Sequence, residues 1–237
     1  MEIKQFRYSA DNLSYIIYNG DECAAIDGGA ADEILDFINN KNIKLKYVLN
    51  THAHPDHTPG NSKLLNETES KFITCEKLAE QKSFMLGTEN IDILSTPGHT
   101  EDSITFHIML ENKKNALITG DTLFNGTVGT CFTGDLEGFL KSVNLILKFS
   151  EDTLIYSGHD YVRANIAFAK TIDPENNNFD KYLNKHDESH VTSSLGDELK
   201  VNPYLRFNDP AMIEIMNKRN LPVKSETDRW NSIMHVY

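Results

Sequence analysis

Short apolar runs alternate with amphipathic segments over the first two thirds of the chain. Runs with the length and composition of buried strands occur at 13–19, 23–27, 46–51, 91–95, 103–110, 115–121 and 153–158. Helices are expected at 31–40, 136–149 and 161–172. In the first of these, Ile34, Leu35 and Ile38 fall on one face, as in a helix packed on one side. This alternation predicts an α/β body.

The C-terminal third has a different pattern. Beyond about residue 165 it favours helical segments, separated by Pro174, Pro203, Pro210 and Pro222, and no strand is expected there. We therefore predict an α/β domain at 1–165 and a small helical C-terminal domain at 166–237.

Composition and charge narrow the functional classes. No apolar run approaches the roughly 20 residues that span a bilayer, and the N-terminus lacks the features of a secretory signal, so a cytoplasmic protein is expected. Cys23, Cys75 and Cys131 form no CxxC pair, which fits a reducing compartment. The net charge of −12 disfavours a nucleic-acid partner. The oligomeric state is left open.

The residues with the clearest chemistry follow the ends of predicted strands. The stretch THAHPDHT (51–58) places three histidines and an aspartate within six residues, directly after a strand. TPGHT, ITGDTLF and YSGHDY each bring one more imidazole or carboxylate to such a position. Loops that follow strands can converge on a single site. The full set is His52, His54, Asp56, His57, His99, Asp121 and His159.

Five imidazoles and two carboxylates, with no cysteine, suit zinc, iron(II) or manganese. One ion would not need seven protein ligands, because a catalytic metal keeps a position open for water. We therefore expect two divalent ions, with zinc first among the candidates. The remaining histidines lack this density, and packing or surface roles are expected for His107, His186, His190 and His235.

Taken in order, THAHPDH, PGHT, GDTLF and GHDY resemble the metallo-β-lactamase superfamily of hydrolases. The resemblance implies an αββα sandwich with a dinuclear site at one edge. It further implies two ligand sets joined by a bridging residue: His52, His54 and His99 for the first metal, Asp56, His57 and His159 for the second, and Asp121 between them. An aspartate at the bridge, with no cysteine there, makes the chain less similar to the antibiotic-degrading members.

Within this superfamily the chain most resembles glyoxalase II, the hydroxyacylglutathione hydrolases. GHDYVRANIAFA is similar to the segment with the family's last metal ligand, and SSLGDELKVNPYLRF to part of its helical C-terminal domain. The resemblance implies hydrolysis of a hydroxyacylglutathione-like thioester, with Tyr161 as a substrate contact. The loop NGTVGTCFTGD has Thr130 and Cys131 where the family presents a lysine to glutathione, so these two are the expected contacts there.

The expected mechanism is attack of a metal-bridging hydroxide on the thioester carbonyl, with Asp56 orienting the hydroxide. Asp27, Thr51 and Thr100 are candidates for hydrogen bonds to the imidazoles. The helical tail is expected to pack over the rim of the site and to shape the thiol pocket through Asn202–Arg206, Tyr182 and Trp230.

Two other functions remain open. An iron-dependent persulfide dioxygenase of the same superfamily needs one metal, held by His52, His54 or His99 and a carboxylate, and the second ligand set argues against it. The chain could instead be a metal-binding or sensor protein without turnover, although no ligand is missing from the motifs. Oxygen consumption on a persulfide would identify the first, and metal binding without hydrolysis of any thioester would identify the second.

Overall fold

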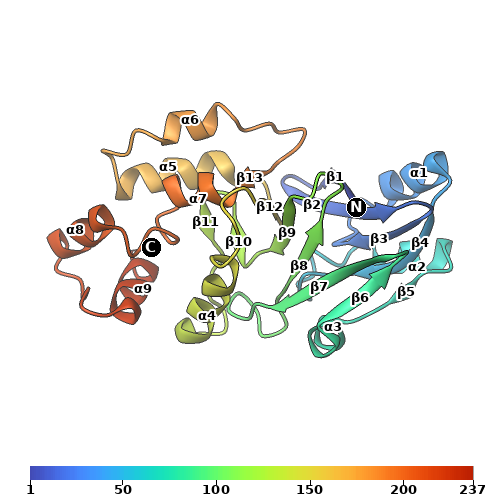
Figure 1. The fold of residues 1–237 in the computed structure, drawn as a ribbon, viewed down its shortest axis with the longest axis horizontal. Helices are drawn as coiled ribbons and strands as arrows, with labels where there is room; N and C mark the ends of the chain where they lie inside the picture. The colour runs from blue at the N-terminus through green and yellow to red at the C-terminus, as the bar shows by residue number, and fades with distance from the viewer. Residues whose placement is uncertain (237) are drawn as a thin grey trace.

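Two mixed β-sheets form the centre of the molecule (Figure 1). The computed structural model describes residues 1–236. The first sheet has the order β1-β2-β3-β4-β5, with β1 (Glu2–Tyr8), β2 (Asn12–Asn19), β3 (Glu22–Ile26), β4 (Lys44–Leu49) and β5 (Lys71–Phe72). The second has the order β13-β12-β9-β8-β7-β6, with β6 (Ser83–Leu86), β7 (Glu89–Ser95), β8 (Ile104–Met109), β9 (Asn115–Gly120), β12 (Leu154–Ser157) and β13 (Ser193–Ser194). A small hairpin pairs β10 (Leu123–Phe124) with β11 (Thr127–Val128).

The central strands are buried on both faces. In β2, Tyr15 and Ile17 join the cluster between the sheets, whereas Ile16 and Tyr18 join the cluster on the opposite face. Successive side chains of a strand point to opposite faces, so a strand covered on both sides has an almost continuous apolar sequence. This burial on both faces is the physical reason why the sequence predicts β2.

Helices cover the outer face of each sheet. The helices are α1 (Ala31–Lys41), α2 (Asn61–Glu67), α3 (Cys75–Gln81), α4 (Leu136–Ile146), α5 (Val162–Ile172), α6 (Phe179–Leu183), α7 (Leu195–Val201), α8 (Pro210–Lys218) and α9 (Glu226–Met234). Ile34 of α1 and Leu64 of α2 pack on the first sheet. Phe139 of α4 packs with Leu117 and Ile155 on the outer face of the second. The layers are therefore helix, sheet, sheet and helix, which confirms the predicted αββα sandwich.

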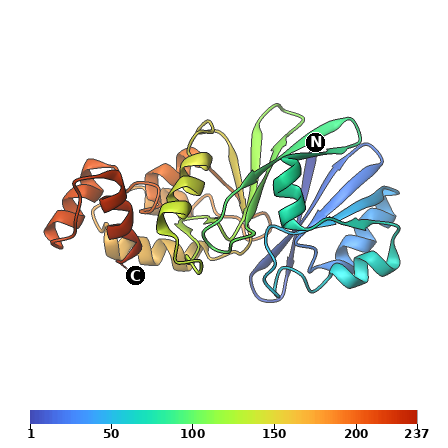
Figure 2. The same ribbon diagram turned by 90° about the horizontal axis from the view of Figure 1, so that it is seen from below.

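The C-terminal helices continue the core on the side of the second sheet. Trp230 of α9 packs against Phe139 of α4 with ring centroids 5.7 Å apart, and its indole N–H donates to the carbonyl of Leu136 at 2.7 Å. Seen from below, α8 and α9 lie at the opposite end of the molecule from the first sheet (Figure 2). The predicted boundary at residue 165 falls inside α5, and the division into two domains stays a prediction.

Several elements were not predicted. β1 pairs antiparallel with β2 from Glu2 to Tyr8, and α2, α3 and β6 are short segments with weak periodicity. The prediction that the tail contains no strand is wrong, because β13 pairs antiparallel with β12. Its two residues are both serines, so only the position of the backbone makes them a strand. Within the described residues, no helix is long and apolar enough to cross a membrane.

Candidate metal centre

Loops that follow four strands meet at one end of the sandwich. β4 leads into the 50–57 segment, β7 into the loop with His99, β9 into Asp121, and β12 into the loop with His159. The possible ligand atoms fall into two groups, each with its members within 4.8 Å of one another: His52, His54, His99 and Asp121 in the first, and Asp56, His57 and His159 in the second. The structure thus brings together all seven residues identified from the sequence.

The first group has the spacing of ligands around one ion. His99 Nε2 lies 3.1 Å from His54 Nδ1 and 3.5 Å from Asp121 Oδ2. His52 Nε2 lies 3.9 Å from the same carboxylate oxygen. Nitrogen ligands of a tetrahedral zinc, each about 2.0–2.1 Å from the ion, stand about 3.4 Å apart. These atoms can therefore share one cation after small adjustments.

The second group repeats this arrangement next to the first. His57 Nε2 lies 3.2 Å from His159 Nε2. Asp56 Oδ2 lies 3.3 Å from His159 Nε2 and 3.7 Å from His57 Nε2. The two imidazoles are buried, whereas the Asp56 side chain is 51% exposed. Asp56 is consequently the member of this group that an incoming molecule can reach.

Asp121 faces both groups. Its Oδ2 lies 3.5 Å from His99 Nε2 and 3.6 Å from His159 Nε2, and its Oδ1 lies 3.4 Å from His57 Nε2. Within the described chain, Asp121 Oδ1 and His52 Nε2 are both buried without a hydrogen-bond partner. Leaving a buried polar atom unpaired costs about 1–3 kcal/mol, more if it is charged. The residues present therefore fit two divalent cations, which would pair these atoms.

Four of the five imidazoles are also held from the outside, through Nδ1. The partners are Thr51 Oγ1 for His52 at 3.0 Å, Asp27 Oδ2 for His57 at 3.0 Å, the Thr130 carbonyl for His99 at 3.0 Å, and Asp11 Oδ1 for His159 at 2.9 Å. Such contacts fix the ring and leave Nε2 free for a cation. His54 differs, because it turns Nδ1 towards His99.

Two of these outer partners, Asp27 and Thr51, were predicted. Within the part of the chain that the structure describes, Thr100 makes no hydrogen bond to an imidazole and bonds Ser103 instead. Asp11 was missed because it lies 148 positions from His159 in the sequence. The carbonyl of Thr130 was missed because a backbone acceptor leaves no mark in the residue type.

Asp27 connects the two groups. Its carboxylate accepts hydrogen bonds from the backbone N–H of Thr51 at 2.8 Å and from Thr51 Oγ1 at 2.7 Å, and it also contacts His57. Its φ of 51° lies in the left-handed region, which aspartate tolerates better than most residues other than glycine. Asp27 therefore fixes the start of the histidine loop as well as one imidazole.

The electrostatics prepare the site for cations. Burial, assisted by repulsion from His57, lowers the pKa of His52 to about 4. Burial opposes ionisation of Asp121, but its interactions with His57 outweigh this and lower the pKa of Asp121 to about 2. Burial likewise opposes protonation of His57, but Asp27 and Asp121 outweigh it and raise the pKa of His57. At neutral pH the site thus holds an ionised Asp121 and a neutral His52, and a metal must displace the proton on His57.

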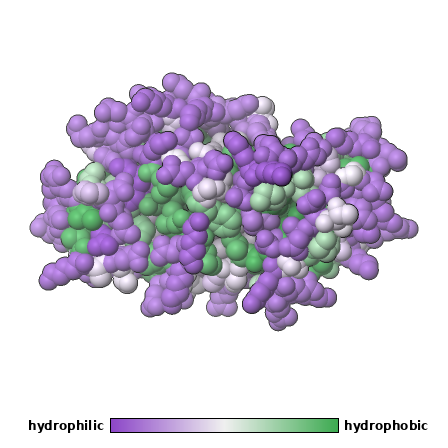
Figure 3. Space-filling model, viewed as in Figure 1, coloured by the Kyte–Doolittle hydropathy of each residue, from purple (hydrophilic) through white to green (hydrophobic). Residues whose placement is uncertain are grey.

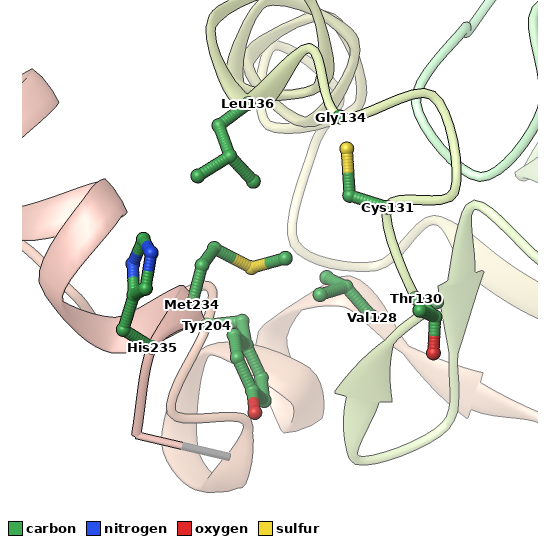
Figure 4. A pocket seen from close by; sticks show the side chains of 9 residues that line it. Val128, Thr130, Cys131, Gly134, Leu136, Tyr204, Met234 and His235 are labelled. Atoms are coloured by element: carbon green, nitrogen blue, oxygen red, sulfur yellow. The ribbon is translucent and has the colours of Figure 1, made fainter.

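A cavity of about 450 Å³ lies between the loop after β11 and the C-terminal part of the chain (Figure 4). Thr130 and Cys131 line one side of it, and Tyr204, Met234 and His235 of the C-terminal part line the other. Thr130 connects this cavity to the first group, because its carbonyl contacts His99. His235, for which only a packing or surface role was expected, borders the cavity.

The surface around this region is mixed. Figure 3 shows a largely hydrophilic face with hydrophobic residues in its middle, between α7 and α4, where Figure 1 draws β10 and β11. Among the predicted contacts of the tail, Tyr204 reaches the cavity. Tyr182 instead is buried and donates to Glu198, Trp230 is buried in the core, and Arg206 pairs with Asp173 at 2.8 Å. None of these three residues lines the cavity, and their expected role at its rim stays a prediction.

Aromatic side chains flank both groups. The Tyr161 ring stacks on His159 with centroids 4.8 Å apart and planes 9° apart. Phe132, which is 67% exposed, places its ring 5.2 Å from His99 and 5.8 Å from His54. Phe132 was not predicted, although an exposed phenylalanine in a glycine-rich loop could have been noticed.

Solved structures share this fold. The BLEG-1 B3 metallo-β-lactamase superposes with a TM-score of 0.64 at 20% identity, covering 86% of this chain and 99% of the other. ETHE1 from Myxococcus xanthus superposes with a TM-score of 0.66 at 22% identity, covering 98% and 100%. The N-terminal residues 10–82 also match the model of the metallo-β-lactamase superfamily. Fold and site together define a member of this superfamily.

A second family model and the relatives of the chain identify the family within this superfamily. Residues 160–232 match the model described as the hydroxyacylglutathione hydrolase C-terminus. The hydroxyacylglutathione hydrolase of Pseudoalteromonas translucida is 33% identical, covering 98% of this chain and 95% of that protein. That of Vibrio cholerae serotype O1 is 31% identical, covering 90% and 89%. The chain belongs to the hydroxyacylglutathione hydrolase (glyoxalase II) family of metal-dependent thioester hydrolases, as the sequence motifs predicted.

Proposed function

We propose that this chain hydrolyses a hydroxyacylglutathione-like thioester at a centre of two divalent metal ions. The observation that carries the proposal is the pair of adjacent ligand groups with one buried carboxylate facing both. The first ion would be held by His52, His54 and His99, the second by Asp56, His57 and His159, and Asp121 would bridge them. Relatives that carry the name hydroxyacylglutathione hydrolase support the substrate class.

The geometry favours two ions over one. A mononuclear iron site, as in a persulfide dioxygenase, would use the first group alone. It would leave a second set of ligand atoms, from Asp56, His57 and His159, gathered within 4.8 Å of one another without an ion. Zinc is the first candidate because imidazole and carboxylate ligands suit it, and iron(II) or manganese accept the same ligands.

Bound divalent ions lower the pKa of water from 15.7 to about 7 and stabilise negative charge on a carbonyl oxygen, which supplies a nucleophile at neutral pH. The chain positions this chemistry. Partial burial opposes ionisation of Asp56, but His57 and a hydrogen bond from Asn12 outweigh it and lower the pKa of Asp56. Asp56 can therefore accept a hydrogen bond from the attacking water and orient it. A thiol has a pKa of about 8.5, so the thiolate leaves without a general acid.

The flanking residues would hold the substrate. Tyr161 and Phe132 offer apolar walls on the two sides of the centre. Burial, together with nearby carboxylates, raises the pKa of Tyr161 to about 12, so its hydroxyl remains a donor at neutral pH. Thr130 and Cys131 would contact the thiol part along the cavity. The 166–237 domain would act in substrate binding through Tyr204, which lines the same cavity.

The cellular setting is part of the proposal. Cys23, Cys75 and Cys131 are all free thiols, which fits a cytoplasmic enzyme in a reducing compartment. The partner would be a small thioester. Neither a nucleic acid nor a membrane is needed for this chemistry.

The test uses metal-replete protein with S-lactoylglutathione and an acyl-coenzyme A side by side, reading free thiol release and metal per chain. His54→Ala should lose both metal and hydrolysis of the glutathione ester. The matched control is His107→Ala, because His107 pairs with Asp92 and Asn115 away from the centre. Full activity with undiminished metal in His54→Ala would refute the site. Two bound metals without any hydrolysis would favour a sensor, and oxygen uptake on a persulfide would favour the dioxygenase.

A further inference from the structure

The turn between β1 and β2 reaches the second ligand group from the N-terminal end of the chain. Asp11 Oδ1 contacts His159 Nδ1 at 2.9 Å, and the Asp11 carbonyl accepts from the backbone N–H of Asp160 at 2.9 Å. Asn12 Nδ2 donates to Asp56 Oδ2 at 3.1 Å. The Tyr8 hydroxyl donates to the Asp56 carbonyl at 2.6 Å. One hairpin therefore contacts both loops, after β4 and after β12, that supply this group.

The two groups differ in the hydrogen-bond partners of the imidazole Nδ1 atoms. In the first group the partners are neutral oxygens: the Thr51 hydroxyl contacts Nδ1 of His52, and the Thr130 carbonyl contacts Nδ1 of His99. In the second group the partners are carboxylates: Asp27 contacts Nδ1 of His57, and Asp11 contacts Nδ1 of His159. A carboxylate at Nδ1 selects the tautomer with a free Nε2 and makes that nitrogen more basic, so it strengthens the ligand towards a cation.

We propose that Asp11 is a positioning residue that gives the second metal position its affinity through His159, while the first position is independent of it. This inference rests on the dinuclear site of the proposed function. Asp27 cannot serve as a selective probe, because it bonds Thr51 as well as His57 and so connects to both groups. Asp11 contacts a candidate ligand of the second group alone.

Asp11 is also a suitable position for substitution. Its side chain is 36% exposed, and its other hydrogen bond uses the backbone carbonyl, which a substitution retains. Asp11→Asn keeps an oxygen that can accept from Nδ1–H but removes the charge, and Asp11→Ala removes both. Comparing the two variants separates the hydrogen bond from the charge.

The experiment titrates metal-free protein with Zn²⁺ against a competing chelator, so that both dissociation constants are measured without an activity assay. Loss of an outer partner typically weakens metal binding by about 10–100-fold. Asp11→Ala should therefore bind one equivalent as tightly as the unmodified chain and the other about 10–100-fold more weakly. Asp11→Asn should fall between them. The matched control is Asp92→Asn, which removes a similar carboxylate–imidazole contact of 3.2 Å at His107.

Three results would overturn the inference. Unchanged affinity for both equivalents in Asp11→Ala would show that the contact has no role, and equal weakening of both would show that it is not selective. Binding of a single Zn²⁺ by the unmodified chain would remove the second position altogether. Failure of the proposed function has a different signature, because selective loss of one ion would stand even if no thioester were hydrolysed.

Discussion

Gly158 offers a test of how tightly the centre is built. It follows β12 and precedes His159, and its φ is not in the left-handed region, so the backbone there accepts alanine. A Cβ at this position would lie 2.2 Å from Asp121 Oδ1 and 2.7 Å from His57 Cε1. Gly158→Ala therefore adds one methyl group between the carboxylate that faces both groups and an imidazole of the second.

The magnitude follows from these contacts. A van der Waals contact begins at 3.4 Å, so Asp121 Oδ1 must retreat by about 1 Å, whereas a metal site tolerates deviations of only about 0.2 Å. Overpacking a buried site costs about 1–3 kcal/mol. We expect the free energy of unfolding of the metal-free chain to fall by about 1–3 kcal/mol. We also expect at least one ion to bind more than about tenfold more weakly, with thioester hydrolysis lost in parallel.

The assay combines urea unfolding of the metal-free protein with metal analysis and thiol release. Gly196→Ala is the control, because its Cβ would also be tight, at 3.0 Å from Glu151 Cβ, but the nearest atoms that it would meet belong to Glu151 and not to a candidate ligand. The control should keep both metals and its activity. Two ions bound with unmodified affinity in Gly158→Ala would refute the close packing of Asp121 and His57 described above.

Three further predictions concern His52, Arg206 and Tyr161. Because burial lowers the pKa of His52 to about 4, the folded metal-free chain binds fewer protons than the unfolded chain between about pH 4 and 6.5. The contribution of a neutral His52 to the free energy of unfolding is fully present above pH 6.5 and should fall by about 2 kcal/mol by pH 4.5, as measured by urea unfolding. His52→Asn should flatten this pH dependence. A chain whose stability does not change between these pH values would contradict the pKa argument. Arg206→Ala leaves the buried carboxylate of Asp173 unpaired and should cost about 3 kcal/mol by the same method, so unchanged stability would count against the pair. Tyr161→Ala should raise KM about 3–10-fold, because it removes the ring beside His159 as well as the hydroxyl donor, and Tyr161→Phe should raise KM less, because it keeps the ring; equal effects would assign the substrate contact to the hydroxyl alone.

The ligand set was determined by the sequence because its signal is local. His52, His54, Asp56 and His57 lie within six residues after a strand, and density at this spacing has few other uses. The strands β2, β3 and β9 could be found for a similar reason, because burial on both faces makes each a largely apolar run. Two other strands, β1 and β13, have no such apolar run, because β1 is half exposed and β13 consists of two serines.

Only the tertiary structure determines the contacts between segments that are distant in the sequence. Asp11 meets His159 across 148 positions, and the carbonyl of Thr130 meets His99 across 31. Such pairs join loops that follow different strands, so they form only when the β1–β2 hairpin and the two sheets are packed together. Residue types and spacing thus specified which atoms can bind metal. The packing of the sheets specified which imidazoles a carboxylate supports, and so how the two metal positions differ.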